Sequence, residues 1–225
     1  MDGDLGELLD HQQGRLVLKL RHMLRGMSLI ELLIGLVIMG ILLSLAAPSY
    51  MAWIQNTKIR TTAEGMLSGL QLARAEAVRR NTQIRFTLTD TLTGACAASV
   101  SGTNWVVSFD DPTALCDSAP MVDDPTVDIG AVAAPRMIQN RPSTDGSTGV
   151  TVAAGQSAIV FNGLGRITPA PAATISLDFT NPTAGACAAL GGGGGPMRCM
   201  RVAVSIGGQI RLCDPARAST DPVGC

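Results

Sequence analysis

Histidine and aromatic residues are scarce in this sequence. Its only two histidines, His11 and His22, both precede residue 27, and aromatic residues make up 3% of the chain. Without histidine, the sequence after residue 26 offers neither a Cys/His metal site nor a Ser/His/Asp or Cys/His catalytic set. We therefore expect no enzymatic activity, no cofactor and no metal. The many Gly, Ala, Ser, Thr and Val residues favour short strands and turns over a helical bundle.

An excess of charge is also missing, because 17 Lys and Arg residues face 18 Asp and Glu residues. This balance gives no overall attraction to nucleic acid or acidic lipid. Five consecutive glycines, residues 191–195, lack the Lys-Ser/Thr pair of a phosphate-binding loop. They are predicted to form a loop between strands.

One uninterrupted apolar run, residues 27–47, holds a single ionisable residue, Glu31. A helix of this length spans about 30 Å, the thickness of a bilayer hydrocarbon core. A membrane-spanning helix is therefore predicted. Lys19, Arg21 and Arg25 precede the run, so this end is expected in the cytoplasm and the rest of the chain outside.

The apolar run fits two kinds of N-terminal signal. A secretory signal is cut after its apolar stretch at small residues, and residues 45–47 (Leu-Ala-Ala) offer such a site. Glu31 suits neither that signal nor an ordinary anchor, because a carboxylate at the centre of the hydrocarbon costs about 2.5–3.5 kcal/mol and needs a partner. An ordinary signal anchor with a chance glutamate is the alternative interpretation.

Residues 25–33, RGMSLIELL, resemble the class III leader of type IV prepilins and pseudopilins. In that family the motif reads, in order, Gly, a residue that is usually aromatic, Thr/Ser, Leu, Ile/Val, Glu and Leu. In this sequence Met27 stands at the position of the aromatic residue. The resemblance implies that a prepilin peptidase cleaves between Gly26 and Met27 and that Met27 is then N-methylated. It also implies that Glu31 neutralises the new terminal amine of a neighbouring subunit during filament assembly.

The helix should continue beyond the apolar run to about residue 80. Pro48 stands where the family often has a helix-bending proline, so a kink is predicted there. Beyond it, apolar residues spaced three and four apart form one stripe, which should lie on a sheet: Ile59, Ala63, Met66, Leu70, Ala73 and Ala77.

After Asn81 the apolar residues alternate with period two, which predicts strands. The alternating stretches are residues 83–89, 104–109, 157–161, 174–179, 200–206 and 209–213. Gly207 and Gly208 indicate a tight hairpin, and residues 110–128, 135–149 and 185–196 indicate loops. The predicted fold is α+β: a long N-terminal helix, with a transmembrane half and an amphipathic half, packed on an antiparallel β-sandwich-like head.

All six cysteines follow the apolar run, and none forms a CxxC pair. An even number on one side of a membrane segment indicates disulfides in an oxidising compartment, so the head is expected in the periplasm or outside the cell. The sequence does not choose among the pairings. Proximity along the chain favours Cys96 with Cys116, Cys187 with Cys199, and Cys213 with Cys225.

The head resembles the GspH/FimT/FimU group of minor pilins and pseudopilins, through residues 71–81, 161–166 (FNGLGR) and 207–214 (GGQIRLCD). The resemblance implies a leader at 1–26, a transmembrane and filament-core helix at 27–48 and a periplasmic head at 49–225, anchored by one pass in the inner membrane. It implies a minor pilin that initiates or caps a type IV pilus with other major and minor pilins. A GspH-like pseudopilin of a type II secretion system is the alternative.

Four arginines lie near the C-terminal end: Arg198, Arg201, Arg211 and Arg217. Arginine clusters bind phosphates through charge-assisted contacts. Some FimT-type minor pilins bind DNA through a Gly-Arg-x-Arg motif, and residues 208–211 here read Gly-Gln-Ile-Arg. Double-stranded DNA is therefore an alternative partner, and an ordinary solvated tail is the other interpretation.

Overall fold

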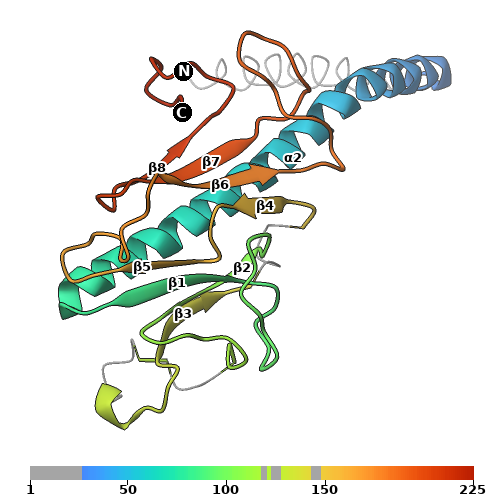
Figure 1. Cartoon of the computed structure of the whole chain (residues 1–225). Coiled ribbons are helices and arrows are strands. Elements are labelled where there is room, and N and C mark those ends of the chain that lie inside the picture. Colours follow the sequence, from blue (N-terminus) through green and yellow to red (C-terminus); the bar gives the residue numbers. More distant parts are fainter. Residues whose placement is uncertain (1–26, 118–120, 123–127, 143–147) are drawn as a thin grey trace, which may run out of the picture. The chain divides into compact units, whose positions relative to one another are not determined.

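One long helix, α2 (Leu29–Arg80), begins the described part of the chain (Figure 1). This computed structural model describes residues 27–117, 121–122, 128–142 and 148–225. The predicted leader, with Gly26, and parts of two predicted loops lie outside the described residues. The chain divides into two compact units, Met1–Pro48 and Ser49–Cys225, and the division falls within α2.

In the first unit, α2 is apolar on every side apart from Glu31 in its first turn. Its large apolar side chains between Leu29 and Leu45 are all at least 52% exposed. By length and composition, α2 is able to cross a membrane. Pro48 lies inside the helix without ending it, and the kink at Pro48 stays a prediction.

In the second unit, α2 has one buried face. The predicted stripe of Ile59, Ala63, Met66, Leu70, Ala73 and Ala77 is 0–1% exposed. Thr57, Arg60 and Glu64 lie on the other side and are exposed. The stripe therefore turns to the protein core, as its spacing predicts.

Two antiparallel four-stranded sheets complete the second unit (Figure 1). The first has the order β3-β2-β1-β5, with strands β1 (Ile84–Thr89), β2 (Asn104–Ser108), β3 (Met137–Arg141) and β5 (Ala158–Phe161). The second has the order β4-β6-β7-β8, with strands β4 (Thr151–Ala154), β6 (Ile175–Thr180), β7 (Met200–Val204) and β8 (Ile210–Cys213). A short 3-10 helix, η1 (Ile129–Ala131), lies before β3.

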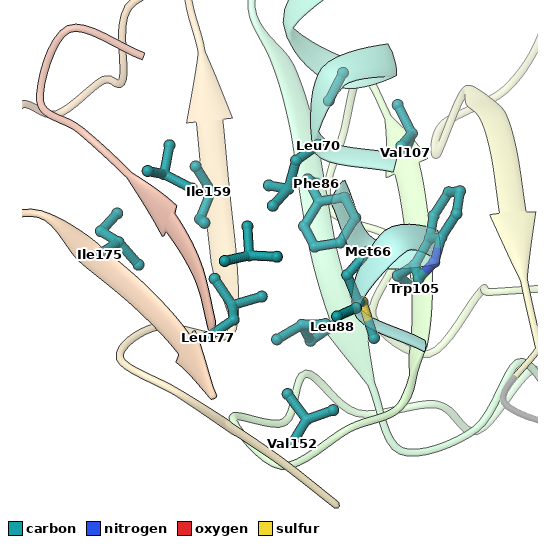
Figure 2. Close-up of a cluster of buried hydrophobic side chains, with 14 of the residues drawn as sticks. Met66, Leu70, Phe86, Leu88, Trp105, Val107, Val152, Ile159, Ile175 and Leu177 are labelled. Carbon is teal, nitrogen blue, oxygen red and sulfur yellow. The ribbon is translucent and has the colours of Figure 1, made fainter. Parts of the chain in front are cut away.

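Side chains from α2 and from both sheets share one core (Figure 2). Leu70 of the helix, Phe86 of β1 and Leu177 of β6 all belong to this cluster. The rings of Phe86 and Trp105 lie 5.7 Å apart between centroids. One helix face thus covers both sheets, which confirms the predicted α+β class.

The sequence predicts six of the eight strands found in the described residues and misses β3 and β4. The prediction of a loop at residues 135–149 is wrong for Met137–Arg141, which form β3. Two neighbours in β3, Met137 and Ile138, are both buried, because Met137 packs with the Cys96–Cys116 cluster while Ile138 faces the main core. Because β3 is covered on both faces, its sequence lacks the alternation of apolar and polar residues that marks a strand. In β4 only Val152 is fully buried, so the signal is too short to detect.

The hairpin predicted at Gly207 and Gly208 joins β7 to β8. The Ser205 N–H donates to the Gln209 carbonyl at 2.9 Å, and the Gly208 N–H donates to the Ser205 carbonyl at 2.8 Å. Gly208 has a φ of +80°, and a Cβ there would collide with the carbonyl oxygen of Gly165. Glycine is therefore required at this position.

The C-terminal end of α2 is held by charged groups. Glu76, 9% exposed, accepts hydrogen bonds from Arg79 at 2.6 Å and from Arg80 at 2.7 Å. The guanidinium groups of Arg80 and Arg136 lie 5.2 and 4.9 Å from the ring centroid of Phe109. These contacts tie the last turn of the helix to the segment between β2 and β3.

Replacing Gly69 with alanine should destabilise the head, whereas replacing Gly65 should not. A Cβ at Gly69 would lie 2.8 Å from Phe86 Cε2 and 3.0 Å from two ring carbons of Trp105, which are fixed in the core. At Gly65 it would meet only the end of the Arg141 side chain, at 2.6 Å. We expect a net loss of about 1 kcal/mol for Gly69→Ala, and no loss or a gain of up to about 1 kcal/mol for Gly65→Ala. Urea unfolding of residues 49–225 measures both, and equal effects would contradict this account of the packing.

Candidate functional site

The first turn of α2 is capped by Ser28. Its Oγ accepts a hydrogen bond from the backbone N–H of Glu31 at 3.2 Å, and its carbonyl accepts one from the N–H of Leu32 at 3.2 Å. Ser-x-x-Glu is the spacing of a capping box, and an acid in the first turn is favoured by the positive end of the helix dipole. The pilin-like motif alone gives Ser28 no role, although the capping spacing is visible in the sequence.

Met27 and Glu31 lie together at the start of an apolar helix. The side chain of Met27 is 69% exposed, and Glu31 is exposed among Ile30, Leu32 and Leu33. In the part of the chain that the structure describes, no basic side chain is paired with Glu31. A carboxylate on such a surface carries a large desolvation cost in apolar surroundings unless a cation accompanies it.

Three disulfides join the six cysteines. They pair Cys96 with Cys116, Cys187 with Cys199, and Cys213 with Cys225, the pairing that proximity favours. The sequence separations are 20, 12 and 12 residues, and closing loops of this size stabilises a domain by about 3 kcal/mol each. The first disulfide is buried with Val106 and Met137 on the outer side of β2 and β3.

Two of the four predicted arginines, Arg201 and Arg211, lie on the outer face of the second sheet. Val202 and Val204, which alternate with Arg201 along β7, are fully buried on the other face, and Arg211 is paired with Ala203 across the ladder. Arg201 Nε donates to Asp178 at 2.6 Å. Arg211 Nη2 donates to the Cys225 carbonyl at 3.2 Å.

The other two arginines, Arg198 and Arg217, meet at an open groove of about 430 Å³. The first turns of the head half of α2 form its other wall, which brings Trp53 and Arg60 into the site. The sequence motif does not indicate Arg60, because it lies far from the arginine cluster along the chain. The remaining lining residues are Asn56, Thr57, Met200, Leu212, Cys213, Asp214 and Val223.

Each groove arginine has a carboxylate partner. Arg60 pairs with Glu64 at 2.7 Å, Arg198 with Asp214 at 3.5 Å, and Arg217 with Asp221 at 3.0 Å. The backbone N–H of Val223 and the Arg217 guanidinium lower the pKa of the Asp221 carboxyl below its ordinary value. The groove therefore presents balanced charges at neutral pH.

Within the described ranges, no three His, Cys, Asp or Glu side chains gather as a metal site would require. The described residues thus offer an apolar helix with one carboxylate and a groove of paired charges.

Two family models match the chain. The model of the prokaryotic N-terminal methylation motif matches residues 21–47, which include Gly26, Met27 and Glu31. The model described as type II transport protein GspH matches residues 62–208, more than half of the chain. The chain belongs to the GspH family. This confirms the family to which the sequence resemblance points.

Solved structures similar to this GspH-family chain include a type IV minor pilin and a GspH protein. The type IV minor pilin FimU of Pseudomonas aeruginosa is similar in two crystal forms: at 17% identity with a TM-score of 0.43, covering 72% of this chain and 94% of FimU, and at 16% identity with a TM-score of 0.44, covering 75% and 95%. GspH of E. coli is similar at 16% identity with a TM-score of 0.39, covering 75% of this chain and 95% of GspH. At such identities the likeness concerns the fold alone. No curated protein matches the chain.

Removing the Arg217 side chain should raise the pKa of Asp221. The carboxylate then loses a cation that stabilises its charged form, but it keeps the hydrogen bond from the Val223 N–H at 3.0 Å. We therefore expect Arg217→Ala to move the pKa upward without fully restoring the ordinary aspartate value. Carboxyl-carbon NMR titration of residues 49–225 measures this change. Arg201→Ala is the matched control, because Arg201 pairs with Asp178 instead, and an equal shift in both variants would contradict the pairing.

Proposed function

We propose that this GspH-family chain is a minor pilin that helps to initiate or cap a type IV pilus. A prepilin peptidase cleaves it between Gly26 and Met27, and Met27 is N-methylated. Before assembly the chain is anchored in the inner membrane by α2, and its head lies in the periplasm. The match of the methylation motif to residues 21–47 supports this proposal most directly, because it falls on the one part of α2 that is apolar on every side.

Glu31 has a physical role in this assembly. Cleavage before Met27 creates an ammonium group beside the apolar turn that carries Glu31. When helices pack side by side, the ammonium of one subunit and the carboxylate of its neighbour offset each other's desolvation, which neither charge achieves alone. The Ser28 cap fixes the helical start of the turn that presents the carboxylate.

The three disulfides support a periplasmic head. Disulfides persist in the oxidising periplasm and are rare in the cytosol, and all six cysteines are paired on the head side of the apolar run. The basic residues before the run favour retention of the opposite end in the cytoplasm.

Intact-mass analysis of the chain from purified membranes and from sheared pili tests the proposal. We expect a species that begins at Met27 and is heavier than the unmodified chain by one methyl group. A chain that keeps its first 26 residues, or that is cut after Ala47, would overturn it.

Glu31→Gln is the sharpest variant for the same experiment. The amide keeps the shape of the side chain and removes the charge that the neighbouring amine needs, so processed protein should remain in the membrane while its amount in sheared pili falls by about tenfold or more, given a buried-pair cost above ~1.4 kcal/mol. Glu64→Gln is the matched control, because Glu64 is an exposed acid of the same helix that pairs with Arg60. Equal incorporation of both variants would contradict the role of Glu31.

A pseudopilin of a type II secretion system is the second candidate. The family description, type II transport protein GspH, favours it. The chemistry of α2 serves both filaments equally. Deleting the gene separates them, because the pilus function predicts lost piliation with normal secretion, and the secretion function predicts the reverse.

Binding of double-stranded DNA is not favoured by the arginines of the described chain, because each of the four has an internal partner. In a gel-shift assay at physiological salt, residues 49–225 should not retard double-stranded DNA. The double variant Asp214→Asn with Asp221→Asn should bind more tightly, since Arg198 and Arg217 then become unopposed, and its binding should weaken with added salt. Tight, salt-sensitive binding by the unmodified head would instead support a role in DNA uptake.

A further inference from the structure

Two aromatic side chains are exposed at the start of the head half of α2. Tyr50, the only tyrosine, is 60% exposed, and Trp53 is 62% exposed, whereas the other tryptophan, Trp105, is 3% exposed. The rings of Tyr50 and Trp53 are stacked, with centroids 5.9 Å apart and an interplanar angle of 25°. A spacing of three places them on one helix face.

This face changes character immediately after the aromatic pair. Thr57, Arg60 and Glu64 continue the same row at spacings of four, three and four, and all three are exposed. Arg60 and Glu64 form an ion pair whose side chains are 70% and 48% exposed. The border between apolar and polar surface along this exposed face of α2, part of which also lines the arginine groove, therefore falls between Trp53 and Thr57.

The position of the pair along the helix fits the edge of a bilayer. Tyr50 and Trp53 follow Ala47, the end of the apolar run, by three and six residues. At the α-helical rise these steps are about 5 and about 9 Å along the helix. The polar headgroup region adds about 5–8 Å on each side of the hydrocarbon core, so the backbone of Tyr50 falls within it and that of Trp53 just beyond its outer edge. Because side chains on a helix lean toward its N-terminus, which here is the membrane side, the Trp53 ring also reaches this level.

We propose that Tyr50 and Trp53 seat the unassembled chain in the headgroup region of the phospholipid bilayer. Each ring has an apolar body and one hydrogen-bond donor, the Tyr50 O–H and the Trp53 Nε1–H, and such rings favour the level of the lipid headgroups. The pair fixes how far α2 sinks into the membrane, and the polar row from Thr57 onward stays in water. The inference rests on the proposed membrane anchorage.

The exposed apolar surface at Tyr50 and Trp53 has a second copy of the chain as its rival occupant. The lipid is favoured by the sharp change to polar residues one turn later, at the height where a bilayer also becomes polar. The two occupants differ in what lies within contact distance of the indole ring, lipid chains and headgroups in one case and protein in the other.

Fluorescence quenching by brominated lipids tests the proposal on the full chain. The protein is reconstituted in phosphatidylcholine vesicles that carry bromine either near the headgroup or near the end of the acyl chain. We expect stronger quenching by the shallow bromines and an emission shift to shorter wavelength relative to the detergent-free head. Trp53→Phe should abolish the quenchable emission, because the remaining Trp105 is buried in the core.

Resistance to alkaline carbonate extraction is measured on the same vesicles. A chain that resists extraction but shows no bromine quenching, or stronger quenching by deep bromines, overturns the seating of the pair and leaves the anchorage intact. A second copy of the chain occupies the surface if the emission is shifted but not quenched, and if the shift disappears when the protein is diluted in lipid. A chain that is extracted by carbonate overturns both the anchorage and the inference.

Discussion

The burial of one helix stripe against two sheets is the contact on which the head depends. Ile59, Met66 and Leu70 supply the large side chains of this stripe, and no other described helix covers the sheets. Because both sheets use the same covering element, a void at the stripe affects them together. Gly69 shows how close the contact is, since the rings of Phe86 and Trp105 occupy the space of its missing side chain.

The two parts of this helix suit different surroundings. Around Leu33 and Ile38 it is apolar on every side, which suits lipid or the inside of a helical bundle. After Trp53 the helix has one buried face and one solvent-exposed face. A single element thus combines a segment long and apolar enough to cross a membrane with one layer of a globular core, and the sequence pattern changes within a few residues of Pro48.

How much of this is visible in the sequence depends on whether the signal is local. The stripe of α2 and six strands follow from short-range periodicity, and the acid at Glu31 follows from a motif within nine residues. Strand β3 escapes detection because Met137 and Ile138 are covered on opposite sides by segments distant in the chain. The arginine groove cannot be predicted for the same reason, since Arg60 and Arg217 come together only in the folded chain. The ion pair between Arg201 and Asp178 on neighbouring strands is likewise not visible in the sequence.

The order of the cysteine pairs suits a chain that enters an oxidising compartment gradually. Each of the three disulfides joins a cysteine to the next one along the sequence. A polypeptide threaded across a membrane with its anchor first delivers these residues one after another, so the second cysteine of each pair finds its mate as the unpaired cysteine that crossed just before it. When oxidation keeps pace with emergence, the correct covalent pattern is the pattern of first encounters and needs no later exchange of partners.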